Sequence, residues 1–259
     1  MMKNKIGIVT GVANDRSIAW GIAEALHREG AKVILSYQGE GLLKRIKPLA
    51  AKIDAEIIEV DATDPEGMVR LSAKAAEVGG IDFFVHAMAF ADRDTLNGRF
   101  IDTKAEAFSQ AMSISCYSLI EMVQVLEPHF KPEASVLTLS FEGARRTFQN
   151  YNLMGAAKAA LEASVRYLAV DLGKNNVRIN ALSAGAMRTV AGSAIGSARF
   201  TYQWLEKNTP LGRNPALEEV GNSGLYLLSP LSRGVTGEVH HADCGYNTVG
   251  MVRPNHEES

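Results

Sequence analysis

The chain opens with KIGIVTGVANDRSIAWGIAEALHREGAKVILSY (Lys5–Tyr37), and this stretch sets the fold of everything that follows. Its first residues, Lys5–Thr10, form a short apolar run with β-branched side chains, which is typical of a buried strand. Apolar side chains then recur at helical spacing over Ser17–Glu29, and Gly30 ends that helix. A second apolar run, Lys32–Tyr37, completes the pattern. The stretch therefore predicts a βαβ unit with two parallel strands and a right-handed crossover.

The same alternation of strand-like and helix-like segments continues along the chain. Further helices are expected at Gly41–Ile53, Glu66–Val78, Thr103–Glu127 and Tyr151–Leu172. Further strands are expected at Glu56–Val60, Ile81–His86, Ser135–Leu139, Val177–Leu182 and Glu238–Ala242. This order predicts an α/β fold, a single-domain, Rossmann-like, doubly wound parallel sheet of about seven strands with helices on both faces. We expect the domain to cover residues 1–252 and residues 253–259 to be a disordered tail.

The composition narrows the function classes. The 259 residues carry a formal net charge of −2 with both signs spread along the chain, which does not indicate a nucleic-acid binder. No apolar run is long enough to span a bilayer, and the first strand starts too close to Met1 to leave room for a signal peptide. Cys116 and Cys244 form neither a C-x-x-C motif nor a metal-ligand spacing. We therefore expect a cytoplasmic protein without a metal site, a membrane segment or a nucleic-acid partner.

The turn after the first strand lies where a dinucleotide pyrophosphate would bind the amides of a helix N-terminus. The G-x-G-x-x-G spacing is absent, because Gly11 is followed by a longer loop and then Ser17–Gly21. A glycine after a strand is often a plain turn, so this turn alone leaves both interpretations open. Gln38 stands just past the second strand, where Asp or Glu would bind the adenosine ribose. The choice between NADH and NADPH therefore stays open, and Lys44 and Arg45 fit either a 2′-phosphate site or a solvated helix face.

Two polar residues lie at the ends of strands on the predicted ligand edge. Asp61 directly follows Glu56–Val60, where a carboxylate would meet the adenine, although it fits equally a turn or a helix cap. His86 ends a buried strand, and the favoured interpretation is a core histidine whose hydrogen bonds are satisfied.

The stretch Asn150–Lys158 (NYNLMGAAK) opens the helix that follows the fifth strand. Tyr151 and Lys158 are seven positions apart, almost two turns, so their side chains share one face about 10 Å apart along the axis. The ammonium is expected to lower the pKa of the phenol, and the phenol to donate to a developing oxyanion. The alternative is a surface lysine and a half-buried tyrosine on an ordinary helix. The position after the fifth strand of a nucleotide-binding pattern favours the catalytic interpretation.

A run rich in Gly, Ala and Ser lies between the sixth and seventh strands, within Ser183–Asn208. Small residues beyond the carboxyl end of a strand suit a mobile lid over a site. A plain surface loop is the alternative. The position at the ligand edge of the sheet favours a substrate lid near residues 184–208.

Together these features resemble the short-chain dehydrogenase/reductase superfamily and, within it, the bacterial NAD(P)H-dependent enoyl-acyl-carrier-protein reductases. Most of the superfamily places the lysine one helical turn after the tyrosine, whereas two turns are typical of the enoyl reductases. The resemblance extends from Lys5 to Met251. Its matching stretches are Thr10–Ala13, Ser17–Ala19, Ser36–Gln38, Val85–His86, Phe90–Ala91, Tyr117–Ser118, Asn150–Lys158, Leu161–Ala163, Val165–Tyr167, Asn180–Ala181, Ser183–Gly185, Arg188–Thr189, Glu219–Asn222 and Gly237–Val239.

The resemblance implies a role for each member of the pair. Lys158 would hold the nicotinamide ribose hydroxyls, and Tyr151 would donate to the thioester carbonyl of a trans-2-enoyl chain while hydride passes to its β-carbon. The cofactor would be NADH, with NADPH as the alternative, and the substrate would be carried by acyl carrier protein in type II fatty-acid synthesis. The implied cofactor-binding residues are Gly11, Ser17, Ile18, Gln38, Asp61, Ala62, Ala87, Lys158, Met187 and Thr189. The implied substrate-pocket residues are Phe141, Ala89, Phe90 and Met154.

The resemblance also implies a homotetramer, which is the usual assembly of the family. The small residues on the helix after Tyr151 suit close helix packing at such an interface, and they are Gly155, Ala156, Ala159, Ala160 and Ala163.

Several positions depart from the family pattern. Phe141 stands where a second tyrosine usually lies beside the substrate, so the ring is kept and the hydroxyl is lost. The other departures are Ala87 for a serine, Ala89 for a glycine, Ala186 for a proline, and His241–Cys244 at the usual ending. Because the tyrosine–lysine pair survives, we expect a working reductase. The alternatives are a divergent short-chain reductase acting on another activated alkene or a ketone, and a nucleotide-binding paralogue without catalysis.

Overall fold

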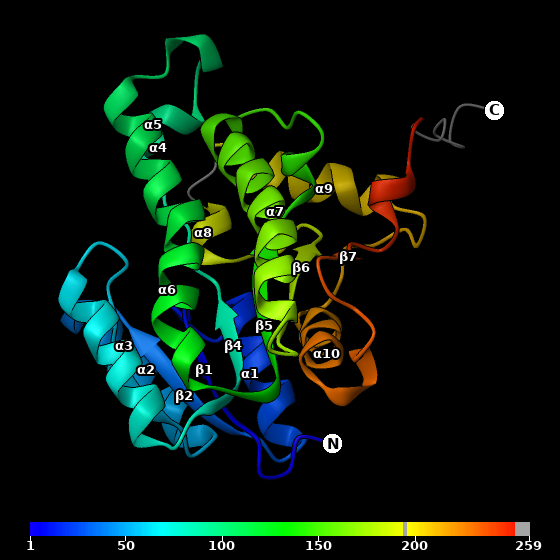
Figure 1. The fold of residues 1–259 in the computed structure, drawn as a ribbon. Helices are drawn as coiled ribbons and strands as arrows, with labels where there is room; N and C mark the ends of the chain where they lie inside the picture. The colour runs from blue at the N-terminus through cyan, green and yellow to red at the C-terminus, as the bar shows by residue number, and fades with distance from the viewer. Residues whose placement is uncertain (194–195, 252–259) are drawn as a thin grey trace.

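The fold comes from a computed structural model that describes residues 1–193 and 196–251. Within these residues, seven strands form one sheet in the order β3-β2-β1-β4-β5-β6-β7, and every neighbouring pair is parallel. The strands are β1 Ile6–Val9, β2 Lys32–Tyr37, β3 Glu56–Glu59, β4 Ile81–His86, β5 Phe130–Ser140, β6 Arg178–Ala184 and β7 Val239–Ala242. The predicted doubly wound parallel sheet is therefore confirmed (Figure 1), and only β5 starts well before its predicted first residue, Ser135.

Helices cover both faces of the sheet. Side chains alternate across a strand, so neighbouring residues of β1 belong to different cores: Val9 to the core that contains Trp20 of α1, and Ile8 to the core that contains Leu161 of α7. Helices α1, α2 and α10 lie on the first face, and α3, α6 and α7 on the second. The helices are α1 Ile18–Arg28, α2 Gly39–Lys52, α3 Pro65–Glu77, α4 Arg93–Leu96, α5 Ala105–Met112, α6 Ser118–Leu126, α7 Asn152–Gly173, α8 Val190–Ser193, α9 Ala198–Asn208 and α10 Leu217–Leu228.

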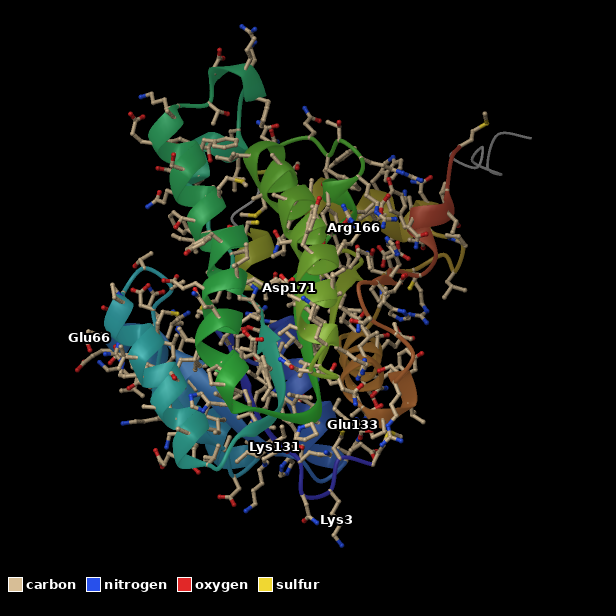
Figure 2. The ribbon with its side chains drawn as sticks, in the orientation of Figure 1. Lys3, Glu66, Lys131, Glu133, Arg166 and Asp171 are labelled. Carbon is tan, nitrogen blue, oxygen red and sulfur yellow. The ribbon has the colours of Figure 1, made fainter. Side chains whose placement is uncertain are left out.

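Charged side chains mark the outer sides of these layers. Glu66 on α3 and Arg166 and Asp171 on α7 are exposed, and Figure 2 shows them on the helix sides that face away from the sheet. This arrangement gives each helix one apolar side toward the strands, as the amphipathic pattern predicts. Among the described residues, no helix is both long and apolar enough to cross a bilayer.

The structure adds features that the sequence pattern did not give, among them helices α4, α8, α9 and α10. The helix predicted over Thr103–Glu127 is a continuous helical run that starts at Ala105 and contains a π-helical segment, Ser113–Tyr117, between α5 and α6. Helix α10 was not predicted, and it packs against α1 through glycines: a Cβ added at Gly221 would lie 2.4 Å from the Gly21 carbonyl oxygen. A Cβ added at Gly21 would in turn lie 2.8 Å from Leu217 Cγ, at the start of α10.

The sheet brings the site residues together at one edge. The carboxyl ends of β1, β4, β5 and β6 lie side by side, because the strands pair in register and run parallel. The segments that leave these ends carry Gly11, Ala87, Phe141 and Gly185. Ligands bind at this edge in open α/β sheets.

The tail predicted at residues 253–259 and residues 194–195 of the predicted lid lie outside the described residues.

Candidate active site

A cavity of about 550 Å³ opens at this edge of the sheet. Its lining gathers ten of the residues singled out from the sequence: Ile18, Ala87, Ala89, Phe90, Phe141, Tyr151, Met154, Lys158, Met187 and Thr189. The remaining five, on the cofactor side, are not part of this lining: Gly11, Ser17, Gln38, Asp61 and Ala62. Most of the lining is apolar, and the predicted pair contributes a phenol and an ammonium to it.

The ammonium of Lys158 is fixed beside the end of β5. The side chain is 7 % exposed, and Nζ donates a hydrogen bond of 2.7 Å to the Leu139 carbonyl oxygen. Burial lowers the pKa of Lys158 to about 8, although the nearby Cys116 and Glu162 oppose this fall. The group is therefore a cation at neutral pH, held at a defined point of the cavity wall.

Tyr151 lies immediately before α7 and is 8 % exposed. Burial raises the pKa of its phenol, and the Glu162 carboxylate raises it further. The prediction that Lys158 lowers this pKa is wrong, because removal from water disfavours the phenolate and the ammonium is engaged with the Leu139 carbonyl. Tyr151 is therefore a neutral phenol, which is the form that can donate a hydrogen bond.

Aromatic rings flank this phenol. The Phe141 ring centroid lies 5.1 Å from that of Tyr151, edge to face, and 4.8 Å from that of Phe148. Phe141 thus keeps an aromatic wall beside Tyr151 and brings no polar atom to it. The two phenylalanine rings therefore make the cavity apolar on this side of the Tyr151 ring.

The turn after β1 is closed by a glycine and a serine. Gly11 has φ +78°, and a Cβ added there would lie 2.0 Å from the Ala87 carbonyl oxygen, so only glycine fits. The Ser17 hydroxyl accepts hydrogen bonds from the amides of Ala13 and Asn14. The turn is therefore held rigidly at the N-terminus of α1, where free helix amides suit a phosphate.

Gln38 and Asp61 meet beyond the ends of β2 and β3. The Gln38 side-chain amide donates to the Asp61 carboxylate at 2.7 Å, and the amide and hydroxyl of Thr63 donate to the same carboxylate at 2.8 Å. Burial alone would raise the pKa of Asp61, but these hydrogen bonds hold it below its usual value. Asp61 thus organises a turn, while Asp64 caps α3.

The basic residues considered for a 2′-phosphate site, Lys44 and Arg45, are exposed on α2.

The prediction that His86 is a core residue is confirmed. It is fully buried, with Nδ1 2.9 Å from the Thr138 hydroxyl and Nε2 2.8 Å from the Ser118 hydroxyl. Burial, and then the Lys158 charge, lower its pKa to about 3, so it is neutral and links two strands to α6.

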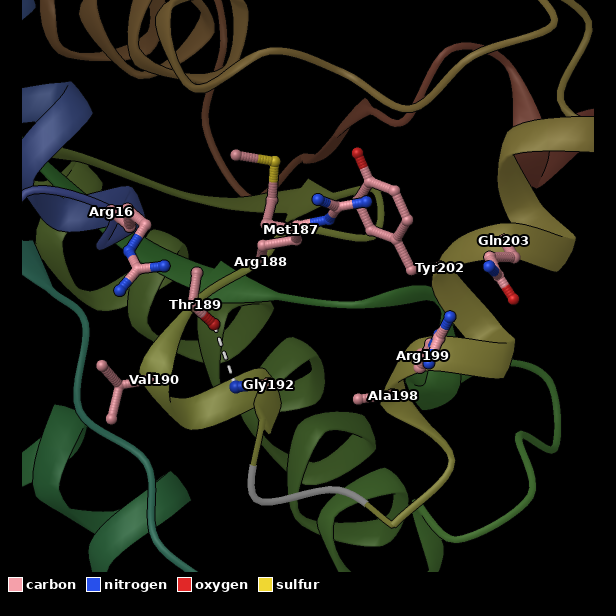
Figure 3. A pocket seen from close by; sticks show the side chains of 10 residues that line it. All are labelled: Arg16, Met187, Arg188, Thr189, Val190, Gly192, Ala198, Arg199, Tyr202 and Gln203. Carbon is pink, nitrogen blue, oxygen red and sulfur yellow. Dashed lines mark hydrogen bonds between the residues drawn. The ribbon is translucent and has the colours of Figure 1, made fainter.

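A second cavity of about 550 Å³ adjoins the first and shares residues with it (Figure 3). Helices α8 and α9, within the predicted lid, border both cavities. In the second cavity, the Thr189 hydroxyl accepts a hydrogen bond of 2.9 Å from the Gly192 amide. Its lining includes three arginines, and the Arg188 guanidinium lies 4.4 Å from the Tyr202 ring centroid. The segment predicted to be a lid therefore lies beside the cavity rather than apart from it.

Two carboxylates near the pair were not singled out from the sequence. Glu162 follows Lys158 by one helical turn, is buried, and accepts a hydrogen bond of 2.6 Å from the Ser140 hydroxyl. Its i+4 spacing was a usable signal. Glu142, also buried, belongs to the loop before α7, and no periodic pattern marks it.

A doubly wound parallel sheet, a glycine turn after β1, and a Tyr–Lys pair two turns apart on the helix after β5 define a nucleotide-binding reductase of the short-chain dehydrogenase/reductase type. Residues 11–247 match the family model described as "Enoyl-(Acyl carrier protein) reductase". The chain belongs to this family.

Named relatives and solved structures agree with this assignment. "Enoyl-[acyl-carrier-protein] reductase [NADH] 1" of Rhizobium meliloti is 51 % identical, over 97 % of this chain and 93 % of that protein. FabI of Rickettsia bellii, also named as NADH-dependent, is 46 % identical over 96 % of each chain. The crystal structure of FabI from Candidatus Liberibacter asiaticus superposes with a TM-score of 0.94 at 46 % identity, covering 97 % of this chain and 98 % of that one. The Anaplasma phagocytophilum reductase in complex with NAD gives 0.93 at 45 % identity, covering 98 % and 96 %.

Proposed function

We propose that this chain reduces the trans-2 double bond of enoyl thioesters, carried on acyl carrier protein, with NADH in type II fatty-acid synthesis. The observation that carries the proposal is a neutral phenol and a fixed ammonium, Tyr151 and Lys158, in the wall of one largely apolar cavity. An acyl chain suits the apolar lining, and the two polar groups suit a thioester carbonyl and a ribose.

The residues on the cofactor side fit an extended dinucleotide. Gln38 and Asp61 would meet the adenosine end, the turn at Gly11 the pyrophosphate, and Lys158 the nicotinamide ribose. The ionised Asp61 carboxylate would repel a 2′-phosphate, and Gln38 brings no positive charge to neutralise one. These features support NADH over NADPH.

A nicotinamide held by Lys158 and the Gly11 turn would supply the hydride. Tyr151 donates a hydrogen bond to the thioester carbonyl oxygen, on which negative charge grows as the β-carbon accepts the hydride. Because the bond strengthens with that charge, it stabilises the transition state more than the ground state. Lys158 adds a positive field and donates to the ribose hydroxyls, while the Leu139 carbonyl fixes its position. Phe141 and Phe148 give this side of the cavity an apolar wall, and uptake of a solvent proton at the α-carbon would complete the reduction.

An oxidation assay tests the proposal. NADH and NADPH are offered in turn with a crotonyl thioester and with an acetoacetyl thioester, and loss of the reduced nucleotide is followed by absorbance. Turnover of the enoyl substrate alone supports the proposal. Turnover of the keto substrate would instead indicate a different short-chain reductase, and binding of NADH without any turnover would indicate a non-catalytic nucleotide-binding protein.

The outer face of α7 supports a homotetramer as a second part of the proposal. Tyr167 and Val170 are 74 % and 68 % exposed on this helix, beside the charged Arg166 and Asp171. A second copy that meets this face about a two-fold axis would cover the apolar pair and bring opposite charges together. Light scattering measures the oligomeric state of the wild type and of Tyr167→Asp. A wild-type tetramer that Tyr167→Asp weakens supports the proposed assembly, and a monomeric wild type would contradict it.

Three smaller expectations complete the proposal. Residues 1–252 act as one reductase domain, in which 184–208 form the lid, supported by the position of α8 and α9 beside both cavities. The two free thiols, Cys116 and Cys244, support a location in the reducing cytoplasm. Limited proteolysis with and without NADH tests the lid, since protection of 184–208 by the cofactor is the expected result.

A further inference from the structure

A buried carboxylate lies directly behind the aromatic wall of the site. Glu142 begins the 3₁₀ turn Glu142–Ala144, follows Phe141, and is 4 % exposed. Its Oε1 lies 3.1 Å from Arg146 Nε, whereas its Oε2 accepts no hydrogen bond from the described part of the chain. That second oxygen lies 3.5 Å from His241 Nε2, which is equally unpartnered among the described residues. Two buried polar atoms that lack other partners therefore face one another.

The surrounding charges favour an ionised Glu142. Arg146 and His241 face it directly, Arg145 lies near but pairs with Glu162, and Asp243 is committed to the amides of the following turn. Burial raises the pKa of Glu142, and Asp243 adds to this rise, whereas Arg146, His241 and Arg145 oppose it. A buried carboxylate that lost either direct partner would be left poorly compensated.

The turn that Glu142 begins forms one wall of the catalytic phenol. A Cβ added at Gly143 would lie 2.4 Å and 2.6 Å from Tyr151 Cδ1 and Cε1, and a Cβ added at Gly155 would lie 2.8 Å from the Gly143 carbonyl oxygen. The turn is therefore closely packed between the Tyr151 ring and the first part of α7. A displacement of this turn would leave the ring without its support on that side.

The carboxylate also joins three segments that are distant in sequence. Arg146 donates to the Asn247 and Val249 carbonyl oxygens at 2.7 Å and 2.6 Å, near the end of the described chain, and His241 belongs to β7. The Glu142 side chain thus ties the turn behind Tyr151 to β7 and to the segment after it.

We propose that Glu142 is a positioning residue for Tyr151, and that His241 Nε2–H completes its support by donating to Glu142 Oε2. The pair holds the 3₁₀ turn against the phenol ring, so that the hydroxyl meets the thioester oxygen in the orientation that the transition state requires. This inference rests on the proposed function, because it assigns a reason for the position of the residue that stabilises the enolate.

Four single variants, and the double variant of Glu142→Gln with His241→Leu, test the inference by separating charge, hydrogen bonding and stability. Glu142→Gln keeps the shape and removes the charge. His241→Leu removes the donor, and His241→Gln restores an Nε2–H at the same distance along the side chain. Glu133→Gln is the matched control, because Glu133 forms an exposed ion pair of 2.9 Å with Arg233 at the opposite end of β5. For each variant, kcat, KM, the Kd of NADH and the thermal midpoint are measured.

The expected result is a loss in kcat that binding does not share. Glu142→Gln and His241→Leu each lower kcat by about tenfold or more, and together they lower it little further, because both disrupt one unit. The Kd of NADH stays within about twofold of wild type. His241→Gln keeps more than roughly half of the wild-type kcat, and Glu133→Gln is unchanged.

The pH profile gives a second readout. Wild-type kcat falls on the acid side as Glu142 gains a proton and its ion pairs are lost, since burial holds this pKa above its usual value. Glu142→Gln lacks this fall. Wild-type kcat in Glu142→Gln, equal losses in His241→Gln and His241→Leu, or a parallel loss of NADH affinity would each overturn the inference. A wild-type protein without enoyl reduction would overturn the proposed function instead.

Discussion

Replacing Tyr151 by Phe removes one hydroxyl from the cavity wall and leaves the ring in place. The ring keeps its contacts with Phe141, at 5.1 Å between centroids, and with Gly143, so neither the fold nor the thermal midpoint is expected to change. Under the proposed function, the variant loses one donor to the thioester oxygen that becomes negative in the transition state.

The magnitude follows from the state of this donor. Tyr151 is buried and neutral, and the wall beside it is apolar, so few other hydrogen-bond donors can replace it. A hydrogen bond to a charged group contributes about 1.5–3 kcal/mol. At about 1.4 kcal/mol per factor of ten, kcat of Tyr151→Phe is expected to fall by roughly 10- to 150-fold.

Steady-state oxidation of NADH with a saturating enoyl thioester measures kcat, and fluorescence titration measures the Kd of NADH. Because Lys158 rather than Tyr151 is assigned to the ribose, the Kd is expected to stay within about twofold of wild type. A fall in kcat of less than about threefold would refute the assignment of Tyr151 as the donor.

Four further predictions follow from the same site. Phe141→Tyr restores a hydroxyl to the apolar wall and should change kcat without changing the Kd of NADH; equal turnover of the two proteins would show that this position is neutral. Burial lowers the pKa of Lys158 to about 8, so NADH affinity should weaken as the pH rises through about 8 and the ammonium loses its proton. Titrations of NADH at several pH values check this pH dependence, which Lys158→Met should lack. Gly11→Ala forces a Cβ against the Ala87 carbonyl, so it should lower the free energy of unfolding by about 1–3 kcal/mol and abolish NADH binding. Denaturant melts measure the first effect and NADH titrations the second. Asp61→Asn removes the carboxylate charge and should raise the ratio of NADPH to NADH activity; an unchanged ratio would count against its role at the adenosine end.

The sheet was predictable because buried parallel strands leave a direct pattern in the sequence. Ile8 and Val9 are both apolar since helices cover both faces of β1, and such runs stand out from the amphipathic helices between them. Helix α10 has an apolar side, with Val220, Leu225 and Leu228 buried, but Gly221 and Gly224 inside it disfavour a helix from the sequence alone, and it was missed.

The sequence predicted ten residues that the structure brings around one cavity, but it did not predict their charge states. The two-turn spacing correctly put Tyr151 and Lys158 in one cavity wall. The pKa of Tyr151 was predicted with the wrong sign, because burial depends on the loop before α7 and on Glu162, which the spacing does not describe. Glu142 was not found at all, since its partner His241 is recognisable only after β7 is placed.

The most direct test of the central claim follows the transferred hydrogen itself. NADH that carries deuterium at the transferring position of its nicotinamide is incubated with wild-type protein and a crotonyl thioester, and the product is analysed by mass spectrometry and NMR. The account predicts one deuterium at the β-carbon of the saturated thioester, none at the α-carbon, and markedly slower labelling with Tyr151→Phe or Lys158→Met. An unlabelled product, label at the α-carbon, or labelling as fast in the two variants as in wild type would contradict it.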